Sequence, residues 1–111
     1  MGTNFVRRTP RYSLVVDVEM IDERFATQIK GRTKSLSMFG CGVESLKQFP
    51  KGTNVRIKLF HQIEEARALA RVIYSSPDLG MGFAFTCLDQ ESEQILMWWI
   101  AEYVSTPKQE I

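Results

Sequence analysis

Residues 65–74 of this 111-residue chain are Glu-Ala-Arg-Ala-Leu-Ala-Arg-Val-Ile-Tyr. Small or apolar side chains occupy every even position except the last, which is a tyrosine, whereas Arg67 and Arg71 stand at odd positions. A period of two is typical of a β-strand with one buried face and one exposed face. The three alanines on the buried face leave room for another element of the fold to pack closely against this strand.

Five further stretches show a similar alternation, and short polar connections separate them. They are residues 12–20, 25–36, 40–44, 55–59 and 81–87. In the second of these we expect Phe25, Thr27 and Ile29 to share one side of the strand. Six short strands at this spacing predict an antiparallel sheet that closes on itself as a small barrel.

A helix is expected after the last strand. Asp89 is a candidate N-cap, Glu91 and Glu93 suit the positive start of a helix, and Pro107 lies beyond its end. The apolar side chains at helical spacing are Ile95, Leu96, Trp99, Ile100, Tyr103 and Val104. We expect this face to pack on the alanines of residues 65–74, with Trp99 closing one mouth of the barrel.

The composition is that of one globular domain. Apolar residues make up 44% of the chain, and a chain of this length forms one compact core. We expect the domain to span residues 12–105, with a flexible basic arm before it (residues 1–11) and a tail after it (residues 106–111). No apolar run approaches the ~20 residues that cross a bilayer, and the first residues lack the apolar core of a signal peptide. The sequence therefore predicts a cytoplasmic location without membrane insertion.

The residue inventory limits the chemistry. One histidine and two cysteines cannot supply a closed four-ligand zinc site of the His/Cys type. Neither Cys41 nor Cys87 belongs to a CxxC motif, so we expect reduced, mostly buried thiols. His61 follows the parity of residues 55–59 and is expected at the end of the barrel. We predict no catalytic residue, no metal and no cofactor.

Charge is distributed unevenly along the chain, although the net charge is only +1. Residues 1–60 hold eleven Lys and Arg against five Asp and Glu, a net of +6. Residues 61–111 hold three against eight, a net of −5. The basic half suits an anion, although such a distribution can also arise by chance. The low total charge argues against a nucleic-acid-binding protein, for which Phe60 is the main candidate aromatic residue.

Three arginines precede the first predicted strand: Arg7, Arg8 and Arg11. A guanidinium is a planar fork of permanent donors that pairs bidentately with phosphate or with the O6/N7 edge of guanine. In an extended arm, Arg7 and Arg11 can straddle a ligand. The alternative interpretation is a solvated basic tail.

A second group follows the 25–36 stretch. Ser35 and Ser37 are two residues apart and so point to the same side of a strand. Gly40 allows a tight turn and the close approach of a ligand. The alternative is an ordinary turn between two strands.

Together these two groups resemble the motifs of the PilZ domain family, receptors for the bacterial second messenger cyclic di-GMP. The family's motifs are RxxxR and, some 20–30 residues later, (D/N)xSxxG. Arg7 and Arg11 match the first motif. Ser37 and Gly40 match the second, but Ser35 stands where the family has Asp or Asn. The resemblance covers nearly the whole chain and implies a six-stranded antiparallel β-barrel of the split-barrel type with a C-terminal α-helix.

The resemblance also implies roles for these residues in a non-catalytic receptor. Arg7 and Arg11 would grip phosphates and guanine edges, with Arg8 as an auxiliary cation. Ser37 would offer a hydroxyl, and Gly40 would keep the floor of the site open. Serine in place of the acid or amide exchanges a charge-assisted hydrogen bond for a neutral one, which weakens binding by roughly five- to tenfold. The alternative is a PilZ-fold adaptor that has lost nucleotide binding and acts by protein–protein contact.

Trp98 and Met97 remain as candidates for the surface that meets an unidentified effector protein. Trp98 and Trp99 cannot both face inward, because neighbouring residues on a helix point about 100° apart. An exposed tryptophan beside a methionine suits a partner surface. The alternative is lateral packing on the barrel rim.

Overall fold

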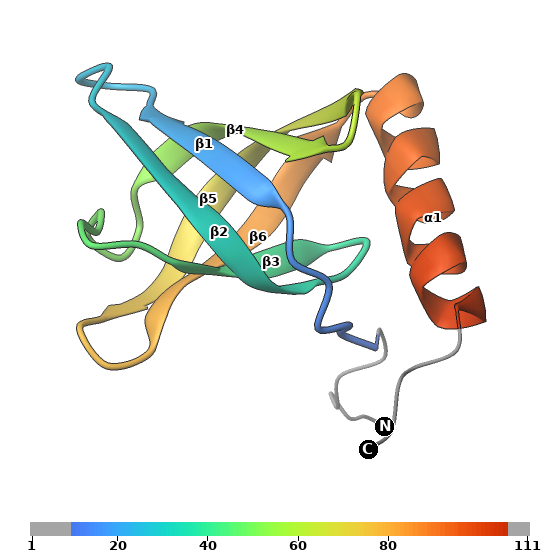
Figure 1. Ribbon diagram of the computed structural model, residues 1–111. Coiled ribbons are helices and arrows are strands. Elements are labelled where there is room, and N and C mark those ends of the chain that lie inside the picture. The colour runs from blue at the N-terminus through green and yellow to red at the C-terminus, as the bar shows by residue number, and fades with distance from the viewer. Residues whose placement is uncertain (1–9, 107–111) are drawn as a thin grey trace, which may run out of the picture.

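The computed structural model describes residues 10–106, which form a closed six-stranded barrel and one helix (Figure 1). The strands are β1 (Asp17–Asp22), β2 (Gln28–Leu36), β3 (Gly40–Glu44), β4 (Asn54–His61), β5 (Glu64–Ser76) and β6 (Gly80–Leu88), and the helix is α1 (Gln90–Ser105). The order around the barrel is β1-β2-β3-β6-β5-β4, and every neighbouring pair is antiparallel. The predicted all-β barrel with a C-terminal helix is confirmed.

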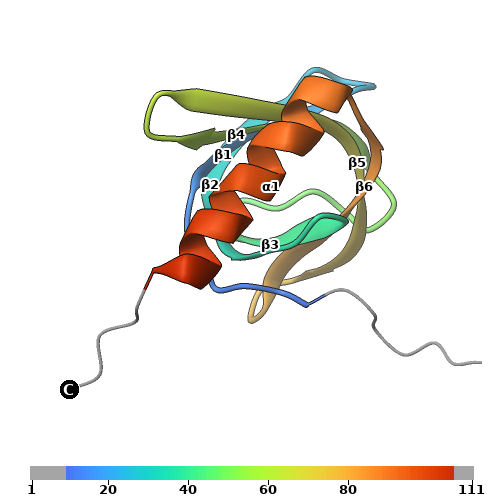
Figure 2. The same cartoon turned by 90° about the vertical axis from the view of Figure 1, so that its right-hand side faces the viewer.

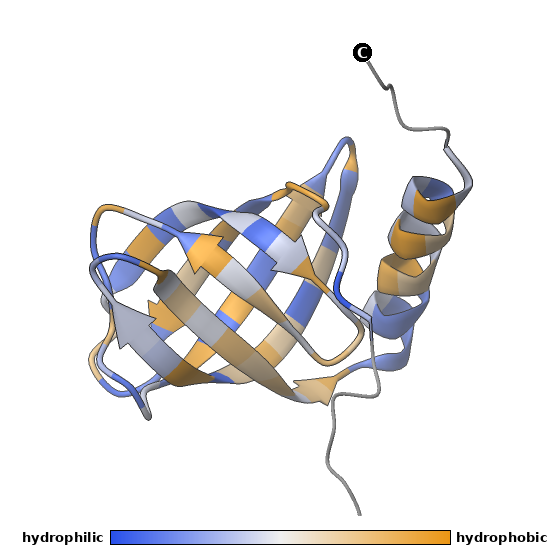
Figure 3. Cartoon of the chain, turned by 90° about the horizontal axis from the view of Figure 1, so that it is seen from below, coloured by the Kyte–Doolittle hydropathy of each residue, from blue (hydrophilic) through white to orange (hydrophobic). Residues whose placement is uncertain are grey.

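The barrel interior is built by the alternation that the sequence shows. In β4, Val55, Ile57 and Leu59 are buried, whereas Arg56 and Lys58 are exposed. In β5 the three alanines are buried and the two arginines are exposed. Figure 3 shows this pattern as alternating hydrophobic and hydrophilic bands along the strands. Burial of this inner face is the main source of stability for such a domain.

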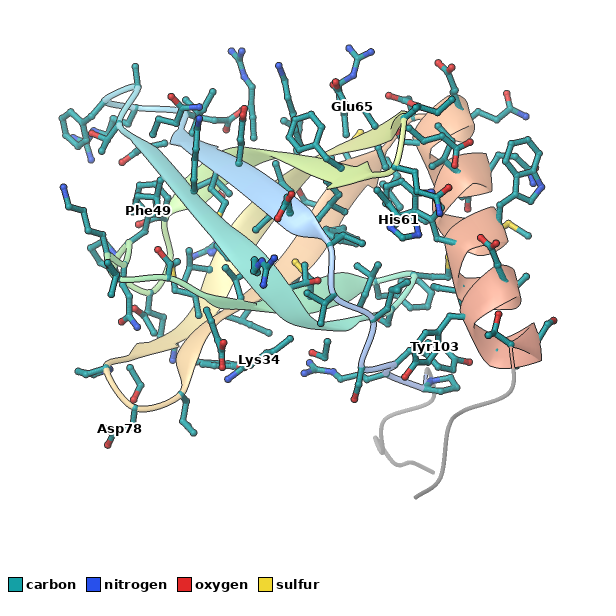
Figure 4. The ribbon with its side chains drawn as sticks, in the orientation of Figure 1. Lys34, Phe49, His61, Glu65, Asp78 and Tyr103 are labelled. Carbon is teal, nitrogen blue, oxygen red and sulfur yellow. The ribbon has the colours of Figure 1, made fainter. Side chains whose placement is uncertain are left out.

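The two ends of the barrel are closed by different elements. At one end α1 lies across the opening (Figure 2) and packs against β5. Leu96 and Trp99 of α1 are buried in the same core cluster as Ala66, as expected. At the opposite end Phe49 is buried in the core cluster (Figure 4).

Thr33 holds the segment before β1 against β2. Its buried hydroxyl accepts a hydrogen bond from the Val16 amide (2.8 Å) and donates one to the Leu14 carbonyl (2.9 Å). The strand expected at residues 12–20 is found as β1, Asp17–Asp22, which both begins and ends later than expected. The chain follows β2 from the Tyr12–Leu36 bridge onward, but regular pairing begins only at Asp17.

Replacing Thr33 by valine keeps its shape and removes its hydroxyl. We expect the free energy of unfolding to fall by about 1–3 kcal/mol, because the Val16 amide and the Leu14 carbonyl lose a buried partner. Chemical denaturation measures this loss. The exposed Thr86 provides the control, and T86V should change stability by no more than about 0.5 kcal/mol. Equal stability of the two variants would contradict the role given to the Thr33 hydroxyl.

Phe25 does not belong to β2, so its predicted place beside Ile29 is wrong. The Asp22 carboxylate accepts hydrogen bonds from the amides of Arg24 (2.8 Å) and Phe25 (3.3 Å), which forms a turn. Ala26 has a positive φ of 61°, and β2 begins only at Gln28. Phe25 is consequently 70% exposed.

Two irregularities in the β5–β6 pairing correct two further predictions. Leu69 pairs with Cys87 and Ala70 with Phe85, so one extra residue, Thr86, lies between them. A bulge of this kind reverses the facing of the residues beyond it. Cys87 is therefore exposed, and the prediction of a mostly buried thiol holds only for Cys41.

The second irregularity lies between Val72 and Tyr74, which pair with Phe83 and Gly82. Phe83 and Met81 point into the core, so Gly82 and its partner Tyr74 face outward. Tyr74 thus leaves the buried face on which the even positions of residues 65–74 placed it.

The N-terminus of α1 is capped as predicted. The Asp89 carboxylate accepts a hydrogen bond from the Ser92 amide (2.7 Å), and this bond lowers the pKa of Asp89. The Ser92 hydroxyl accepts from the Arg67 amide (2.8 Å), which joins the helix to β5.

The apolar face of α1 is narrower than expected, because Val104 is 57% exposed and does not belong to the buried face. Within residues 10–106, no helix is both long and apolar enough to cross a membrane.

Candidate functional site

The chain before β1 meets the end of β2 at the candidate site. The Tyr12 and Leu36 amides donate to each other's carbonyls, at 2.9 and 2.8 Å. In an antiparallel bridge the residues before and after such a pair also face each other. Arg11 therefore lies opposite Ser37. Arg7 and Arg8, also predicted for this site, lie outside the described residues.

A bulge in β2 brings two polar side chains to the outer face of the barrel. The β2–β3 register shifts between Thr33 and Ser35, and Thr33 and Leu36 are buried. Lys34 and Ser35 are both partly exposed, and a Cβ added to Gly42 would touch the side chains of both. Ser35 thus lies on the outer face with Lys34 beside it, whereas Ser37, which follows the end of β2, is buried with 5% of its surface exposed.

Two glycines form the floor next to Ser35. Gly42 pairs with Ser35 on one side and with Gly82 of β6 on the other, and Gly82 pairs with Tyr74. A Cβ on Gly82 would lie 2.0 Å from the Tyr74 ring, and one on Gly42 would lie 2.9 Å from the Ser35 hydroxyl. These four residues and Lys34 form a row across the outer sheet, which we call the glycine face.

The turn between β2 and β3 uses Ser37 and Gly40 for its own structure. The Ser37 hydroxyl accepts from the Phe39 amide (3.1 Å), and the Ser37 amide donates to the Gly40 carbonyl (2.9 Å). A Cβ on Gly40 would lie 2.1 Å from the Phe83 carbonyl oxygen. Glycine is therefore required at position 40 by the close approach of β6, whether or not a ligand binds there.

The electrostatics place a permanent positive charge beside this turn. Burial raises the pKa of the Cys41 thiol to about 12, and the Arg11 guanidinium acts in the opposite direction. Arg11 is exposed, so its donors are accessible to a ligand. The Lys34 ammonium donates to the Leu79 carbonyl, which fixes a second cation in the glycine face. The Lys34 side chain can be followed in Figure 4.

Sequence reasoning did not single out Lys34, Tyr74 or Gly82 for this site. Tyr74 lies at a bulge, so a strict period of two assigns it to the wrong face. Lys34 lies on the outer face, as its alternation with the buried Ile29 and Thr33 predicts, but nothing in the pattern connected it with the site. The Gly-Met-Gly stretch at residues 80–82 was a usable signal, because a glycine inside a strand often marks close backbone approach.

The helix residues predicted for a partner surface are not part of the glycine face. Trp98 and Met97 are 57% and 50% exposed. They line two different hollows, one on each side of α1.

His61 lies at the end of β4 as expected, with its ring edge-on to Trp99 at a centroid distance of 5.4 Å (Figure 4). The described part of the chain holds no cluster of three or more His, Cys, Asp or Glu that could bind a metal.

Comparison with known families decides the assignment. The sequence profile of the PilZ domain matches residues 5–102. This chain belongs to the PilZ domain family. PilZ domains are a family of cyclic di-GMP receptors, and they are generally non-catalytic receptor or adaptor domains. The resemblance that the motifs indicated is confirmed. No curated protein matches the chain.

Solved structures share the fold of this PilZ domain. The PilZ domain of CeSA from a cellulose-synthesizing bacterium is 22% identical, with a TM-score of 0.67 over 86% of this chain and 98% of that one. The PilZ domain of YcgR from Escherichia coli, solved with c-di-GMP, is 18% identical, with a TM-score of 0.69 over 86% and 89%. The inhibitor of motility MotI/DgrA of Bacillus subtilis is 17% identical, with a TM-score of 0.70 over 95% of this chain and 55% of that one.

Proposed function

We propose that this PilZ domain binds cyclic di-GMP on the outer face of the barrel, between the N-terminal arm and the end of β2, without catalysis. The observation that carries the proposal is the position of Arg11, an exposed guanidinium opposite Ser37, which lies two residues after Ser35. Arg11 of the first motif and Ser37 of the second thus flank the Tyr12–Leu36 bridge, which supports a shared site. Membership of a family of cyclic di-GMP receptors supports the same ligand.

The residues at this face suit the chemistry of the ligand. Cyclic di-GMP carries two phosphodiesters and two guanines. Arg7 and Arg11 would pair with phosphates and with guanine O6/N7 edges, and Arg8 would add positive charge. Ser35 would supply a neutral contact. The buried Ser37 hydroxyl already donates to the Gly40 carbonyl (3.4 Å) and accepts from the Phe39 amide, so it would contribute only through its remaining lone pair. Because Ser37 and Gly40 also build the turn, substitutions there test folding as well as binding, and Arg11 and Ser35 are the cleaner probes.

The proposed output is a change in the arm. Bound phosphates would draw the arginines of residues 1–11 onto the barrel, and an effector protein would recognise the surface created by the closed arm. We place this event in the cytoplasm, where a nucleotide second messenger is available to the domain.

Isothermal titration calorimetry with cyclic di-GMP, with GTP as the control ligand, tests the proposal. We expect a saturable isotherm with a micromolar or tighter Kd, and the stoichiometry separates one bound nucleotide from a stacked pair. A flat trace up to ~100 μM bounds the binding free energy at about −5.5 kcal/mol. That result would contradict the receptor proposal and favour the adaptor, with Ser35 as the mark of a lost site.

The substitution S35D restores the acid that the family motif has at this position. We expect affinity for cyclic di-GMP to rise by roughly five- to tenfold, because a carboxylate makes a charge-assisted hydrogen bond to guanine where serine makes a neutral one. N54D, which adds the same charge at an exposed position at the start of β4, is the control and should leave affinity unchanged. No gain from S35D would place Ser35 outside the binding pocket.

A further inference from the structure

A groove separates the β4–β5 turn from the first half of α1. Its volume is about 690 Å³, and its apolar walls are Ile63, Ile95 and Trp98. Ile63, at the tip of the turn, is fully exposed, and Trp98 is 57% exposed. A tryptophan offers a large contact area with few rotatable bonds, which is typical of the side chains that dominate binding surfaces.

The rim of this groove is acidic. Glu64, Glu65 and Glu91 line it, and no Lys or Arg is among its lining residues. Two of these carboxylates are held in place by neighbours. Glu64 accepts from the Trp99 indole N–H (2.8 Å), and Glu65 pairs with the Arg67 guanidinium (3.1 Å). Each carboxylate has acceptor sites beyond these contacts, and Figure 4 shows Glu65 at the end of the barrel nearest α1.

The combination of an exposed tryptophan with glutamates as the only charged lining residues is found at this groove and not at the two neighbouring hollows. The hollow on the other side of α1, which Met97 and Phe39 line, has Glu93 as its single charged residue. The hollow on the outer face of β4, β5 and β6 is lined by three bases and one acid. An exposed tryptophan and a rim lined by three glutamates, of which Glu65 is paired with Arg67, therefore occur together where the β4–β5 turn meets the helix.

We propose that this groove, the Trp98 groove, is the docking site for a partner protein segment in which Lys or Arg neighbours a large apolar side chain. The cation would lie over the Trp98 ring and pair with the carboxylates, and the apolar side chain would cover Ile63. An acidic segment would meet like charges, and an uncharged one would desolvate the carboxylates without compensation. This inference rests on the proposed function, which supplies the existence of a partner protein. It adds where on the domain the partner docks and which charge the docking segment carries.

Selection from a random 12-residue peptide display library on the full chain tests the inference. Enriched peptides are synthesised with a fluorophore, and their Kd is measured by fluorescence anisotropy. We expect enrichment of peptides that combine Lys or Arg with large apolar residues. We expect W98A to weaken their binding at least tenfold and E91Q to weaken it by roughly threefold. Raising the salt concentration should weaken binding further, because exposed charge pairs are screened.

Two matched controls lie on the same helix outside the groove. V104A removes an exposed apolar side chain, and E102Q removes an exposed carboxylate; both should leave the Kd within twofold. Enrichment of acidic peptides, no enrichment above background, or binding that W98A leaves unchanged would overturn the inference.

Calorimetry of W98A with cyclic di-GMP separates this inference from the proposed function. The Trp98 groove and the glycine face share no residue, so W98A should bind the nucleotide as the parent does. Basic peptides that bind through Trp98 to a chain without affinity for cyclic di-GMP would refute the receptor proposal alone. Nucleotide binding without such peptides would refute the groove alone.

Discussion

Replacing Trp99 by alanine is expected to lower the free energy of unfolding by about 3–5 kcal/mol, the range for truncating a buried large aromatic side chain. Trp99 is 2% exposed and lies in the core cluster that joins α1 to the barrel. Its indole N–H donates to Glu64, and its ring contacts His61 edge to face. The substitution therefore removes the side chain that closes one mouth of the barrel. Urea denaturation monitored by circular dichroism measures the loss.

The neighbouring tryptophan supplies the control. W98A removes a side chain of the same type from the exposed side of α1 and should change stability by about 0.5 kcal/mol or less. W99F retains a ring but loses the hydrogen bond to Glu64, and it should fall between the two. A loss below about 1 kcal/mol for W99A would mean that α1 contributes little to the closure of the barrel.

The periodicity of the sequence was sufficient to predict the barrel and the inward position of Trp99, and the capping preference of aspartate predicted the helix cap at Asp89. The periodicity failed where a strand carries an extra residue. Thr86 reverses Cys87, and the irregularity before Tyr74 turns that ring onto Gly82. A bulge is fixed by the pairing of two strands that are distant in the sequence, so neither strand alone indicates it.

The residues of the candidate site were also predicted only in part from the sequence. The motifs identified Arg11, Ser37 and Gly40, and the structure brings these residues to one corner of the barrel. The motifs did not indicate that Gly40 is also required by the Phe83 carbonyl, or that the Ser37 hydroxyl accepts from the Phe39 amide. Short motifs can therefore persist for structural reasons, and binding has to be tested at a residue without such a role.

Arg11 is that residue. It is exposed, and none of the hydrogen bonds or ion pairs described above depends on its side chain. We expect R11A to weaken cyclic di-GMP binding by about 1–3 kcal/mol, the contribution of one bidentate contact to a guanine edge, which corresponds to a roughly 5- to 150-fold rise in Kd. R11K keeps the charge but not the planar fork, so it should recover only part of the loss. Titration calorimetry at fixed salt concentration measures all three proteins.

The matched control for R11A is R32A. Arg32 is an exposed arginine of β2 whose guanidinium lies 3.6 Å from the Asp17 carboxylate, on the part of the strand distant from the turn. Its removal changes the net charge by the same amount and should leave the Kd within twofold. If R11A and R32A weaken binding equally, the loss of affinity comes from the lower net positive charge of the domain and not from a direct contact of Arg11 with the nucleotide. If R11A binds within twofold of the parent, the arm does not hold the nucleotide, and the ligand site must be sought elsewhere on the barrel. A full recovery by R11K would instead identify Arg11 as a point charge beside a phosphate, because only a guanine edge or a bidentate phosphate contact requires the fork.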